Sequence, residues 1–344
     1  MGVFEKLARE YETILFGHEP SAGLRTIVAV YSTARGPAVG GTRMWPYTHE
    51  DLALADVLRL GKAMAYKAAA ADLPLGGGKA VIIGDPARDK TPELLRAYAR
   101  QVDRLGGAYI TTADVGTTVA DLDVIGEVTR HVTGTSRGSG DPSPNTSFGV
   151  WSGMRAVAER AFGEPSLKGK HVVVQGVGKV GGGLARLLAE EGARVTVADL
   201  NEQAARALAH AIDADVVDAA DAASTPCDVL APCALGPVVT DATLASFRCR
   251  AIAGAANNQL ESPAHGRALH DMGILYAPDY VINAGGLINV AVELDGYDVD
   301  VARAKAAAIE QTLRDVFDIA ERENMTPGAA ADRLAEERIK AAHR

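Results

Sequence analysis

One segment of the chain, beginning at His171, constrains the fold more than any other. An apolar run typical of a strand, His171–Gln175, is followed by the glycines Gly176-x-Gly178-x-x-Gly181 and by a helical pattern over Val180–Glu191. Glycines at these spacings allow a tight turn, the close approach of a pyrophosphate to the backbone, and close helix–strand packing. The free N–H groups at the start of the helix would bind the phosphates. The pattern predicts a dinucleotide-binding βαβ unit, although a turn that only packs a helix on a sheet is the alternative.

The second strand of this unit, Arg194–Ala198, is followed by Asp199. A carboxylate there can accept hydrogen bonds from the adenosine ribose and would repel the 2′-phosphate of NADP, so NAD is the expected cofactor. Val177, Lys179 and Val180 complete the predicted cofactor-binding turn. Lys179 either contacts a phosphate or is solvated.

The order of expected elements predicts an α/β protein of two domains. The first part mixes strands (Arg25–Ser32, Ala80–Ile83, Ala108–Thr112) with helices (Leu52–Ala71, Thr91–Leu105), and a Gly/Ser/Pro-rich loop follows at 134–148. From Lys170 onward strands and helices alternate, which indicates a parallel, doubly wound Rossmann sheet. We expect a mixed α/β oligomerisation and catalytic domain at 1–135, with 315–344 packing back on it. The NAD-binding domain is expected at 136–314, with a cleft between the two.

Composition narrows the classes of partner. The chain has 344 residues and a formal charge of 35 − 44 = −9, which argues against a nucleic-acid binder. No apolar run could span a membrane, and residues 1–17 have the pattern of an amphipathic helix suited to subunit contacts. Three cysteines without a CxxC pair indicate reduced thiols and a cytoplasmic protein. His265 and His270 are five residues apart, which is not a zinc-binding spacing, so no metal is expected.

Three polar side chains of the first part are candidates for chemistry. Lys79 follows Gly76-Gly77-Gly78, Lys67 lies in an Ala-rich helical segment, and Asp114 follows an expected strand. Glycine backbone could crowd against a substrate and hold the Lys79 amine in a confined site, where desolvation lowers the lysine pKa and makes the amine a usable base. Alternatives are a surface lysine in a flexible loop, a solvated helix lysine and a turn aspartate. A phosphate-loop motif is excluded because Leu73 and Ala80 stand where it needs Gly and Ser or Thr.

Seven segments carry a family resemblance, in order, over nearly the whole chain. They are GPAVGGTRMWPY, MAYKAAAADLPLGGGKAVIIGDP, YITTADVGTTVADLD, GVGKVG, CDVLAPCALG, IAGAANNQL and YAPDYVINAGGLINVAVEL. The chain resembles the amino acid dehydrogenases of the glutamate/leucine/phenylalanine/valine family, and most closely its leucine and valine branch.

The resemblance implies NAD-dependent, reversible oxidative deamination of an L-amino acid to a 2-oxo acid and ammonium. It implies that Lys67 binds the substrate carboxylate, that Lys79 is the general base, and that Asp114 moves a proton to and from the amino nitrogen. It further places Asn258 on the substrate, and it places Thr146, Cys233, Ala234 and Asn257 at the cofactor. A homo-oligomer, an octamer or smaller, is also implied.

The same resemblance assigns an apolar pocket for the substrate side chain. Its wall is expected to consist of Val39, Gly40, Met64, Thr112, Leu287 and Val290. Because Val39 stands where glutamate enzymes have a lysine, a branched aliphatic substrate is favoured over glutamate. Phenylalanine or another bulky apolar amino acid is one alternative, and a catalytically silent NAD-binding regulatory module is another.

Overall fold

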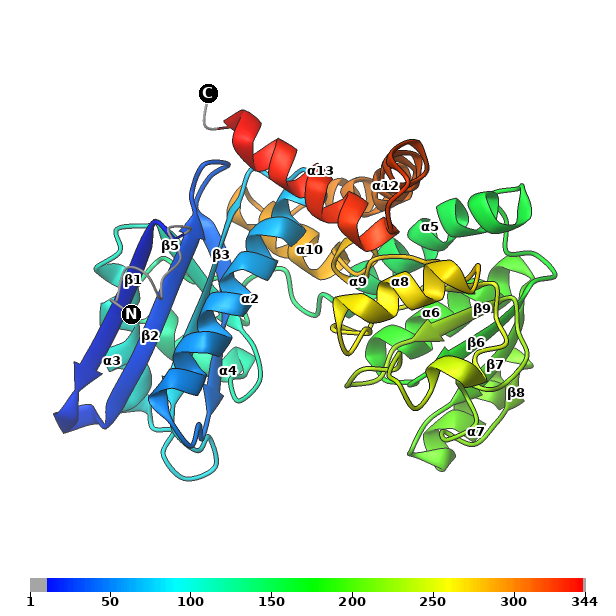
Figure 1. The fold of residues 1–344 in the computed structure, drawn as a ribbon. Coiled ribbons are helices and arrows are strands. Elements are labelled where there is room, and N and C mark those ends of the chain that lie inside the picture. The colour runs from blue at the N-terminus through cyan, green and yellow to red at the C-terminus, as the bar shows by residue number, and fades with distance from the viewer. Residues whose placement is uncertain (1–10, 343–344) are drawn as a thin grey trace. The chain divides into compact units, whose positions relative to one another are not determined.

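The structure is a computed structural model that describes residues 11–342. The chain divides into two compact units (Figure 1). The first contains Met1–Gly140, Val290–Tyr297 and Ala335–Arg344, and the second contains Asp141–Asn289 and Asp298–Leu334. The expected return of the C-terminal region to the first unit is therefore shorter than predicted, since residues 315–334 group with the second unit.

The first unit is built on a mixed sheet with the strand order β1-β2-β4-β3-β5. Strands β1, β2 and β4 pair antiparallel, whereas β3 pairs parallel with both β4 and β5. The strands are β1 Thr13–Glu19, β2 Leu24–Ser32, β3 Ala38–Trp45, β4 Gly76–Ile83 and β5 Tyr109–Ala113, with a 3-10 turn at Pro20–Ala22. Expected strands coincide with β2, β4 and β5, whereas β1 and β3 were not expected.

Helices cover both faces of this sheet. Helix α2 (Glu50–Ala70) packs through Ala53 and Val57 on one face, against Ile27, Ala29 and Val81. Helix α3 (Pro92–Asp103) and helix α4 (Val119–Gly126) cover the other face, where Tyr98 and Tyr109 are fully buried. The small residues of α2 let the helix approach the sheet closely, which matters for the site described below.

The second unit contains a parallel sheet with the order β11-β10-β9-β6-β7-β8, as predicted for a doubly wound fold. Its strands are β6 His171–Gln175, β7 Arg194–Ala198, β8 Asp215–Val216, β9 Val229–Pro232, β10 Ala251–Ile252 and β11 Leu275–Tyr276. The chain runs from β6 outward to β7 and β8, then returns to β9 on the other side of β6. The strand order reverses between β6 and β9, and ligands of such sheets bind at the carboxyl ends of strands at this point.

Helices complete the second unit and the C-terminal region. They are α5 Ser143–Phe162, α6 Lys179–Glu191, α7 Glu202–Ile212, α8 Pro263–Asp271, α9 Asp279–Ile282, α10 Gly285–Leu294, α11 Val299–Ala307, α12 Ile309–Glu323 and α13 Pro327–Ala342, with a 3-10 turn at Leu244–Ser246. The expected helix break at Thr326–Gly328 is present, and the Thr326 hydroxyl accepts a hydrogen bond from Ala329 N–H at 3.3 Å.

Two expectations about local structure differ from the fold. The segment 134–148 is not one loop, because α5 begins at Ser143. Residues 13–17 of the expected N-terminal helix belong to β1, which pairs with β2 over its whole length, and residues 1–10 lie outside the described part of the chain. The apolar pattern Thr-Ile-Leu-Phe is therefore satisfied by sheet pairing.

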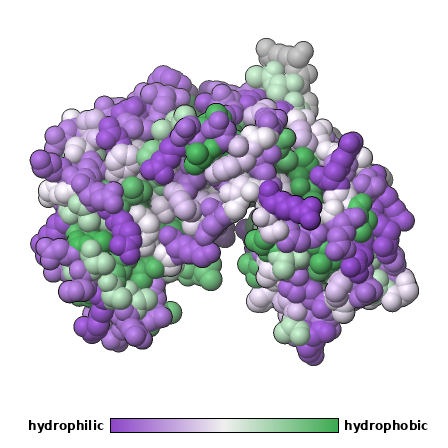
Figure 2. Space-filling view, turned by 180° about the vertical axis from the view of Figure 1, so that it is seen from behind, coloured by the Kyte–Doolittle hydropathy of each residue, from purple (hydrophilic) through white to green (hydrophobic). Residues whose placement is uncertain are grey.

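Hydrophilic residues cover most of the face seen in Figure 2, and apolar residues form separate patches between them. None of the described helices combines the length and the apolar character needed to cross a bilayer.

Candidate active site

The structure brings two of the predicted catalytic residues, Lys79 and Asp114, into direct contact. Lys79 lies in β4 with only 6% of its surface exposed, and Asp114 follows β5 directly. The Lys79 ammonium donates a hydrogen bond to Asp114 Oδ2. Lys79 is therefore neither in a flexible loop nor on the surface, which excludes one alternative interpretation of the GGGK motif.

Burial and pairing act in opposite directions on these two groups. Desolvation lowers the pKa of Lys79 below its usual value, although the Asp114 carboxylate partly opposes this effect. Burial alone would raise the pKa of Asp114, but the charge and hydrogen bond of Lys79 and the N–H of Val115 together hold it below its usual value. The pair thus combines an amine that loses its proton more easily with a carboxylate that stays ionised.

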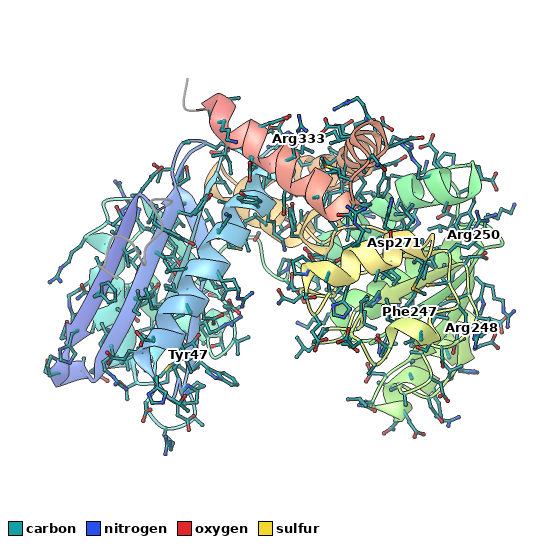
Figure 3. The ribbon with its side chains drawn as sticks, in the orientation of Figure 1. Tyr47, Phe247, Arg248, Arg250, Asp271 and Arg333 are labelled. Atoms are coloured by element: carbon teal, nitrogen blue, oxygen red, sulfur yellow. The ribbon has the colours of Figure 1, made fainter. Side chains whose placement is uncertain are left out.

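Arg43 is a functional candidate that the sequence reasoning missed. It lies in β3, and its guanidinium is 3.7 Å from Asp114 Oδ1 and 2.8 Å from Asp56 Oδ2. Asp56 also accepts hydrogen bonds from the hydroxyl of Tyr47 (labelled in Figure 3) at 2.6 Å and from Arg59 at 2.8 Å. The only available signal was the position of Arg43 two residues after the Gly40-Gly41 pair.

The glycines around Lys79 serve the packing of the protein itself. A Cβ atom on Gly77 would lie 2.0 Å from the backbone N of Ala65 in α2, and one on Gly76 would lie 2.0 Å from Ser32 O. These contacts show that Gly76 and Gly77 are needed for packing, and the expectation that the glycine backbone crowds against a substrate stays a prediction. Their role is to let strand β4 approach α2 and the neighbouring chain segments.

Gly40 and Gly41 are also packed against protein atoms. A Cβ on Gly40 would lie 1.8 Å from Gly78 O, and one on Gly41 would lie 2.8 Å from Asp114 Cβ. The Gly40 carbonyl accepts a hydrogen bond from Tyr109 at 2.6 Å. Gly40 can therefore line a pocket only through backbone atoms, and Gly41 makes room for Asp114.

The remaining predicted substrate residues of the first unit lie on three elements. Lys67 and Met64 are half-buried and three positions apart on α2. Val39 is fully buried in β3, where it pairs with Gly77 and Ile110. Thr112 is half-buried in β5, and its hydroxyl would lie 3.0 Å from a Cβ placed on Gly134.

Helix α10 carries the two other predicted wall residues, Leu287 and Val290. They are three positions apart and so share one face of the helix. Further along α10, the Glu293 carboxylate accepts hydrogen bonds from Gly134 N–H at 2.9 Å and from Ser139 N–H at 3.0 Å. Glu293 was not singled out from the sequence, and it ties the end of α10 to the loop that follows β5 and α4.

In the second unit, the glycine turn has the geometry that its spacing predicts. Gly176 has a left-handed φ of 96°, and a Cβ on Gly181 would lie 1.9 Å from Gly176 O. A Cβ on Gly178, at the N-cap of α6, would meet no atom within 4 Å. The first and third glycines are therefore required by the fold, whereas the second leaves open space where α6 begins.

Residues that follow β9 and β7 lie beside the glycine turn. Cys233 and Ala234 follow β9, and a Cβ on Gly176 would lie 2.7 Å from Ala234 N. Burial raises the pKa of the Cys233 thiol to about 11. Asp199 accepts hydrogen bonds from Val177 N–H at 2.7 Å and Asn201 N–H at 2.8 Å, so it also holds the turn in place.

Lys179 belongs to the turn but is directed elsewhere. Its side chain is 77% exposed, and its ammonium lies 2.8 Å from Asp141 Oδ2. This hydrogen bond is the main reason why the pKa of Asp141 falls to about 2. The next residue, Val180, accepts a hydrogen bond through its carbonyl from the hydroxyl of Ser147 in α5 at 2.8 Å. Sequence reasoning missed Ser147, which fixes the start of α6 against α5.

Three other predicted residues of the second unit lie near these strand ends. Asn257 and Asn258 are exposed in the loop after β10, and Asn258 has a left-handed φ of 53°. The buried Asn283 donates to Asn257 Oδ1 at 2.7 Å and so orients that amide. Thr146 lies in the first turn of α5, where its hydroxyl donates to Pro142 O at 3.0 Å.

The turn fits a dinucleotide. An anionic group can approach Gly178 without steric conflict, and the first N–H groups of α6 favour negative charge. Asp199 offers carboxylate oxygens at the end of the second strand, where a ribose hydroxyl would be bound. The residues present thus match the shape and the charge that a pyrophosphate and an adenosine ribose need.

Among the described residues, one group has the composition of a metal site: Asp241, Glu261 and His265. The His265 ring already has two partners, since Nδ1 lies 3.2 Å from Ser262 N and Nε2 lies 3.1 Å from Asp241 Oδ1. The first contact closes a capping box at the start of α8. Both ring nitrogens of His265 are therefore already engaged, one by the cap of α8 and the other by Asp241.

Comparison with known proteins identifies the class. The family profile described as "Glu/Leu/Phe/Val dehydrogenase, dimerisation domain" matches residues 16–131. The profile described as "Glutamate/Leucine/Phenylalanine/Valine dehydrogenase" matches 138–204 and 196–344. The chain therefore belongs to the glutamate/leucine/phenylalanine/valine dehydrogenase family, and it is an amino acid dehydrogenase that uses a nicotinamide dinucleotide.

Similar proteins include several amino acid specificities. The leucine dehydrogenase of Geobacillus stearothermophilus is 51% identical over 333 residues, covering 96% of this chain and 91% of the relative. The valine dehydrogenase of Streptomyces albus is 48% identical over 336 residues, covering 96% and 92%. The crystal structure of L-tryptophan dehydrogenase from Nostoc punctiforme has a TM-score of 0.89 at 42% identity, covering 99% of both chains.

Proposed function

We propose that the protein catalyses the reversible, NAD-dependent oxidative deamination of a branched-chain L-amino acid to the 2-oxo acid and ammonium. The observation that carries this proposal is the contact of the buried Lys79 with Asp114, in a chain about half identical to leucine and valine dehydrogenases. When bound, the nicotinamide accepts the hydride from the substrate α-carbon, which leaves an imine for the protein to hydrolyse.

Lys67 and Lys79 have different roles in this proposal. Lys67, half-buried on α2, binds the substrate carboxylate by charge. Lys79 takes a proton from the water that attacks the imine carbon, and it can do so because desolvation lowers the pKa of the amine. Asp114, in contact with Lys79, passes a proton to the amino nitrogen as ammonia leaves.

The cofactor is held by the glycine turn and the adjacent strand ends. In this proposal, the N–H groups at Gly178–Gly181 bind the pyrophosphate and Asp199 binds the adenosine ribose. The carboxylate of Asp199 has no nearby cation to accommodate a 2′-phosphate among its described contacts, which favours NAD over NADP. Thr146, Cys233, Ala234 and Asn257 are the proposed contacts of the nicotinamide half, and Asn258 orients the substrate.

A branched aliphatic side chain is the proposed specificity. Val39 is apolar and fully buried, so a substrate carboxylate directed toward it would lose its hydration without gaining a partner. Met64, Leu287 and Val290 supply further apolar surface, and the Thr112 hydroxyl lies toward Gly134. The likeness to an L-tryptophan dehydrogenase supports a second candidate, an aromatic substrate such as phenylalanine or tryptophan.

Two further observations support a proposal for the assembly and the location of the protein. We propose a homo-oligomer, an octamer or smaller, because the first unit matches a profile described as a dimerisation domain and β1 is the outer strand of its sheet. Light scattering coupled to size-exclusion chromatography tests this proposal. The free cysteines favour a reducing compartment such as the cytoplasm.

The test of the main proposal is a substrate panel. Purified protein is incubated with NAD at alkaline pH and L-leucine, L-isoleucine, L-valine, L-phenylalanine, L-tryptophan or L-glutamate, and NADH absorbance is followed. The branched-chain substrates are expected to give the highest kcat/KM, and glutamate none. Higher kcat/KM for an aromatic substrate would replace the specificity proposal, and NAD binding without any turnover would indicate a silent module.

A further inference from the structure

Two of the three cysteines lie opposite each other on neighbouring strands of the second unit. Cys227 precedes β9 and Cys249 precedes β10, and these strands pair parallel with Val229 opposite Ala251. Counting back two residues on each strand places Cys227 opposite Cys249. The Cys227 N–H donates to Arg248 O at 3.2 Å, which is the bond a parallel ladder makes to the residue before the partner.

This spacing suits a disulfide. Adjacent strands lie about 4.8 Å apart, and bridged cysteines have Cα atoms roughly 4.4–6.8 Å apart. Both side chains are half-buried and pack against the same apolar cluster, which includes Leu230 and Phe247. The two sulfurs therefore need little backbone movement to bond, and they are exposed enough for a small oxidant to reach them.

The pair is chemically asymmetric. The interaction between the two thiols lowers the pKa of Cys249 and raises that of Cys227. A thiol with a lowered pKa is more often the thiolate that attacks an oxidant.

The third cysteine provides an internal reference. Cys233 lies at the opposite end of β9, beside Gly181, and its desolvated thiol has a raised pKa. It is separated from Cys227 by the whole length of the strand. Cys233 should therefore stay reduced under conditions that oxidise the pair.

We propose that Cys227 and Cys249 form a reversible intramolecular disulfide when the protein meets a peroxide. The Cys249 thiolate attacks one peroxide oxygen, the O–O bond breaks, and Cys249 becomes a sulfenic acid as water or an alcohol leaves. The Cys227 sulfur then attacks the Cys249 sulfur, the S–O bond breaks, and water leaves with the proton of Cys227. Two thiols lose two electrons and two protons in total, and the peroxide takes them.

The position of the bond predicts its consequence. It would join the amino ends of β9 and β10, whereas Cys233, Ala234 and the glycine turn lie at the carboxyl ends. NAD binding should therefore survive oxidation. The closed loop of residues 227–249 would restrict the unfolded chain, so oxidation should raise the melting temperature.

The experiment uses the full-length protein with hydrogen peroxide as the probe. After treatment and denaturation, free thiols should fall from three to one, and peptide mapping should find Cys227 linked to Cys249 until dithiothreitol is added. Cys233→Ser should still form the bond. Cys227→Ser should instead accumulate a sulfenic acid at Cys249, trapped by dimedone.

Three results would overturn the proposal. The first is that the wild type keeps three free thiols at a peroxide concentration that oxidises Cys249 in the Cys227→Ser variant. The second is a disulfide that includes Cys233. The third is a disulfide between two chains, seen on a non-reducing gel. A loss of NADH binding in fluorescence titration, or a lower melting temperature, with an intact Cys227–Cys249 bond would refute only the predicted consequence. Since the thiol and mass measurements need no substrate, they stand independently of the proposed deamination.

Discussion

The two candidate sites of this protein, one in each unit, are built by different means. In the first unit, Lys79 lies in β4, Arg43 lies in β3 and Asp114 follows β5, and each of these charges already has a partner. In the second unit, the turn at Gly176–Gly181 is a single local segment, with open space at Gly178. The proposed chemistry thus depends on tertiary pairing of charges, whereas the proposed cofactor site depends on backbone shape.

Removal of the Lys79 amine should have the largest effect on activity. Lys79→Met should lower kcat by about 10²- to 10⁴-fold, since a general base contributes on that order. NAD affinity should stay unchanged, because the turn belongs to the other unit. Steady-state kinetics and NADH fluorescence titration measure the two quantities.

A matched control for this variant exists in the same unit. Lys90 also pairs with a carboxylate, Asp121, at 2.7 Å, but that pair lies outside the proposed site. Lys90→Met should keep kcat within about threefold of the wild type, since the pair is structural. Near-normal turnover by Lys79→Met would remove Lys79 from the role of base.

Glycine substitutions should distinguish a glycine that is needed for packing, in the first unit, from a glycine that leaves space for a ligand, in the second unit. Gly77→Ala places a Cβ 2.0 Å from the Ala65 backbone N, so we expect a loss of about 3 kcal/mol or more in the free energy of unfolding. Gly178→Ala places its Cβ in open space, so stability should change by less than about 1 kcal/mol while NAD affinity falls about tenfold or more. Urea unfolding and NADH titration measure these effects. Equal destabilisation by both would contradict the distinction.

The same difference explains what the sequence could predict. The glycine turn, the strands β6 and β7 and Asp199 form one contiguous pattern, so their positions were predicted nearly to the residue. Residue physics alone suggested Lys79 only as one candidate, and the resemblance to the family was needed to assign Lys67 and Asp114. The Lys79–Asp114 contact depends on β3 lying between β4 and β5, which no local pattern encodes.

The features that were not predicted from the sequence, strand β3 and the role of Arg43, also depend on tertiary contacts. Strand β3 contains two glycines, which do not favour a strand, yet it is an interior strand that pairs with β4 and β5. Gly40 and Gly41 are packed there against Gly78 and Asp114. Arg43 lies in that unpredicted strand, so its ion pairs with Asp56 and Asp114 could not be anticipated. Tertiary packing overrides local propensity at these positions.

Arg43 offers the next largest test. Arg43→Met removes the charge beside Asp114, so kcat/KM should fall about 10- to 100-fold, as for a hydrogen-bonded charge. Desolvation dominates the lowered pKa of Lys79, but the Arg43 charge adds to it, and that charge also lowers the pKa of Asp114. The acid limb of the pH profile should therefore move to higher pH in the variant.

Arg59 supplies the control, because it also pairs with Asp56 at 2.8 Å but has no contact with Asp114 among the described ion pairs. Arg59→Met should leave the pH profile unchanged, and Arg43→Lys should restore part of the shift. An unshifted profile in Arg43→Met, with reduced stability, would show that Arg43 is structural only.

A substitution of Asp199 tests whether the candidate cofactor site of the second unit also depends on charge. Val177 N–H and Asn201 N–H bond to different oxygens of Asp199, so Asp199→Asn keeps an acceptor for only one of them and also removes the negative charge. We expect kcat/KM for NAD to fall about tenfold and the preference over NADP to narrow by a similar factor, equivalent to about 1.4 kcal/mol. Kinetics with both cofactors measure the ratio, and an unchanged ratio would mean that Asp199 only holds the turn.

The smallest effect is expected at Lys179. Its ammonium pairs with Asp141, and both side chains are largely exposed to solvent. An exposed ion pair contributes about 0.2–1 kcal/mol and is screened by salt, so Lys179→Met should alter unfolding by no more than this. NAD affinity should change less than about threefold if the backbone of the turn supplies most of the phosphate binding. A larger loss of affinity that disappears at high salt would show that Lys179 leaves Asp141 to bind phosphate. The candidate cofactor site of the second unit would then depend on charge, as the candidate site of the first unit does.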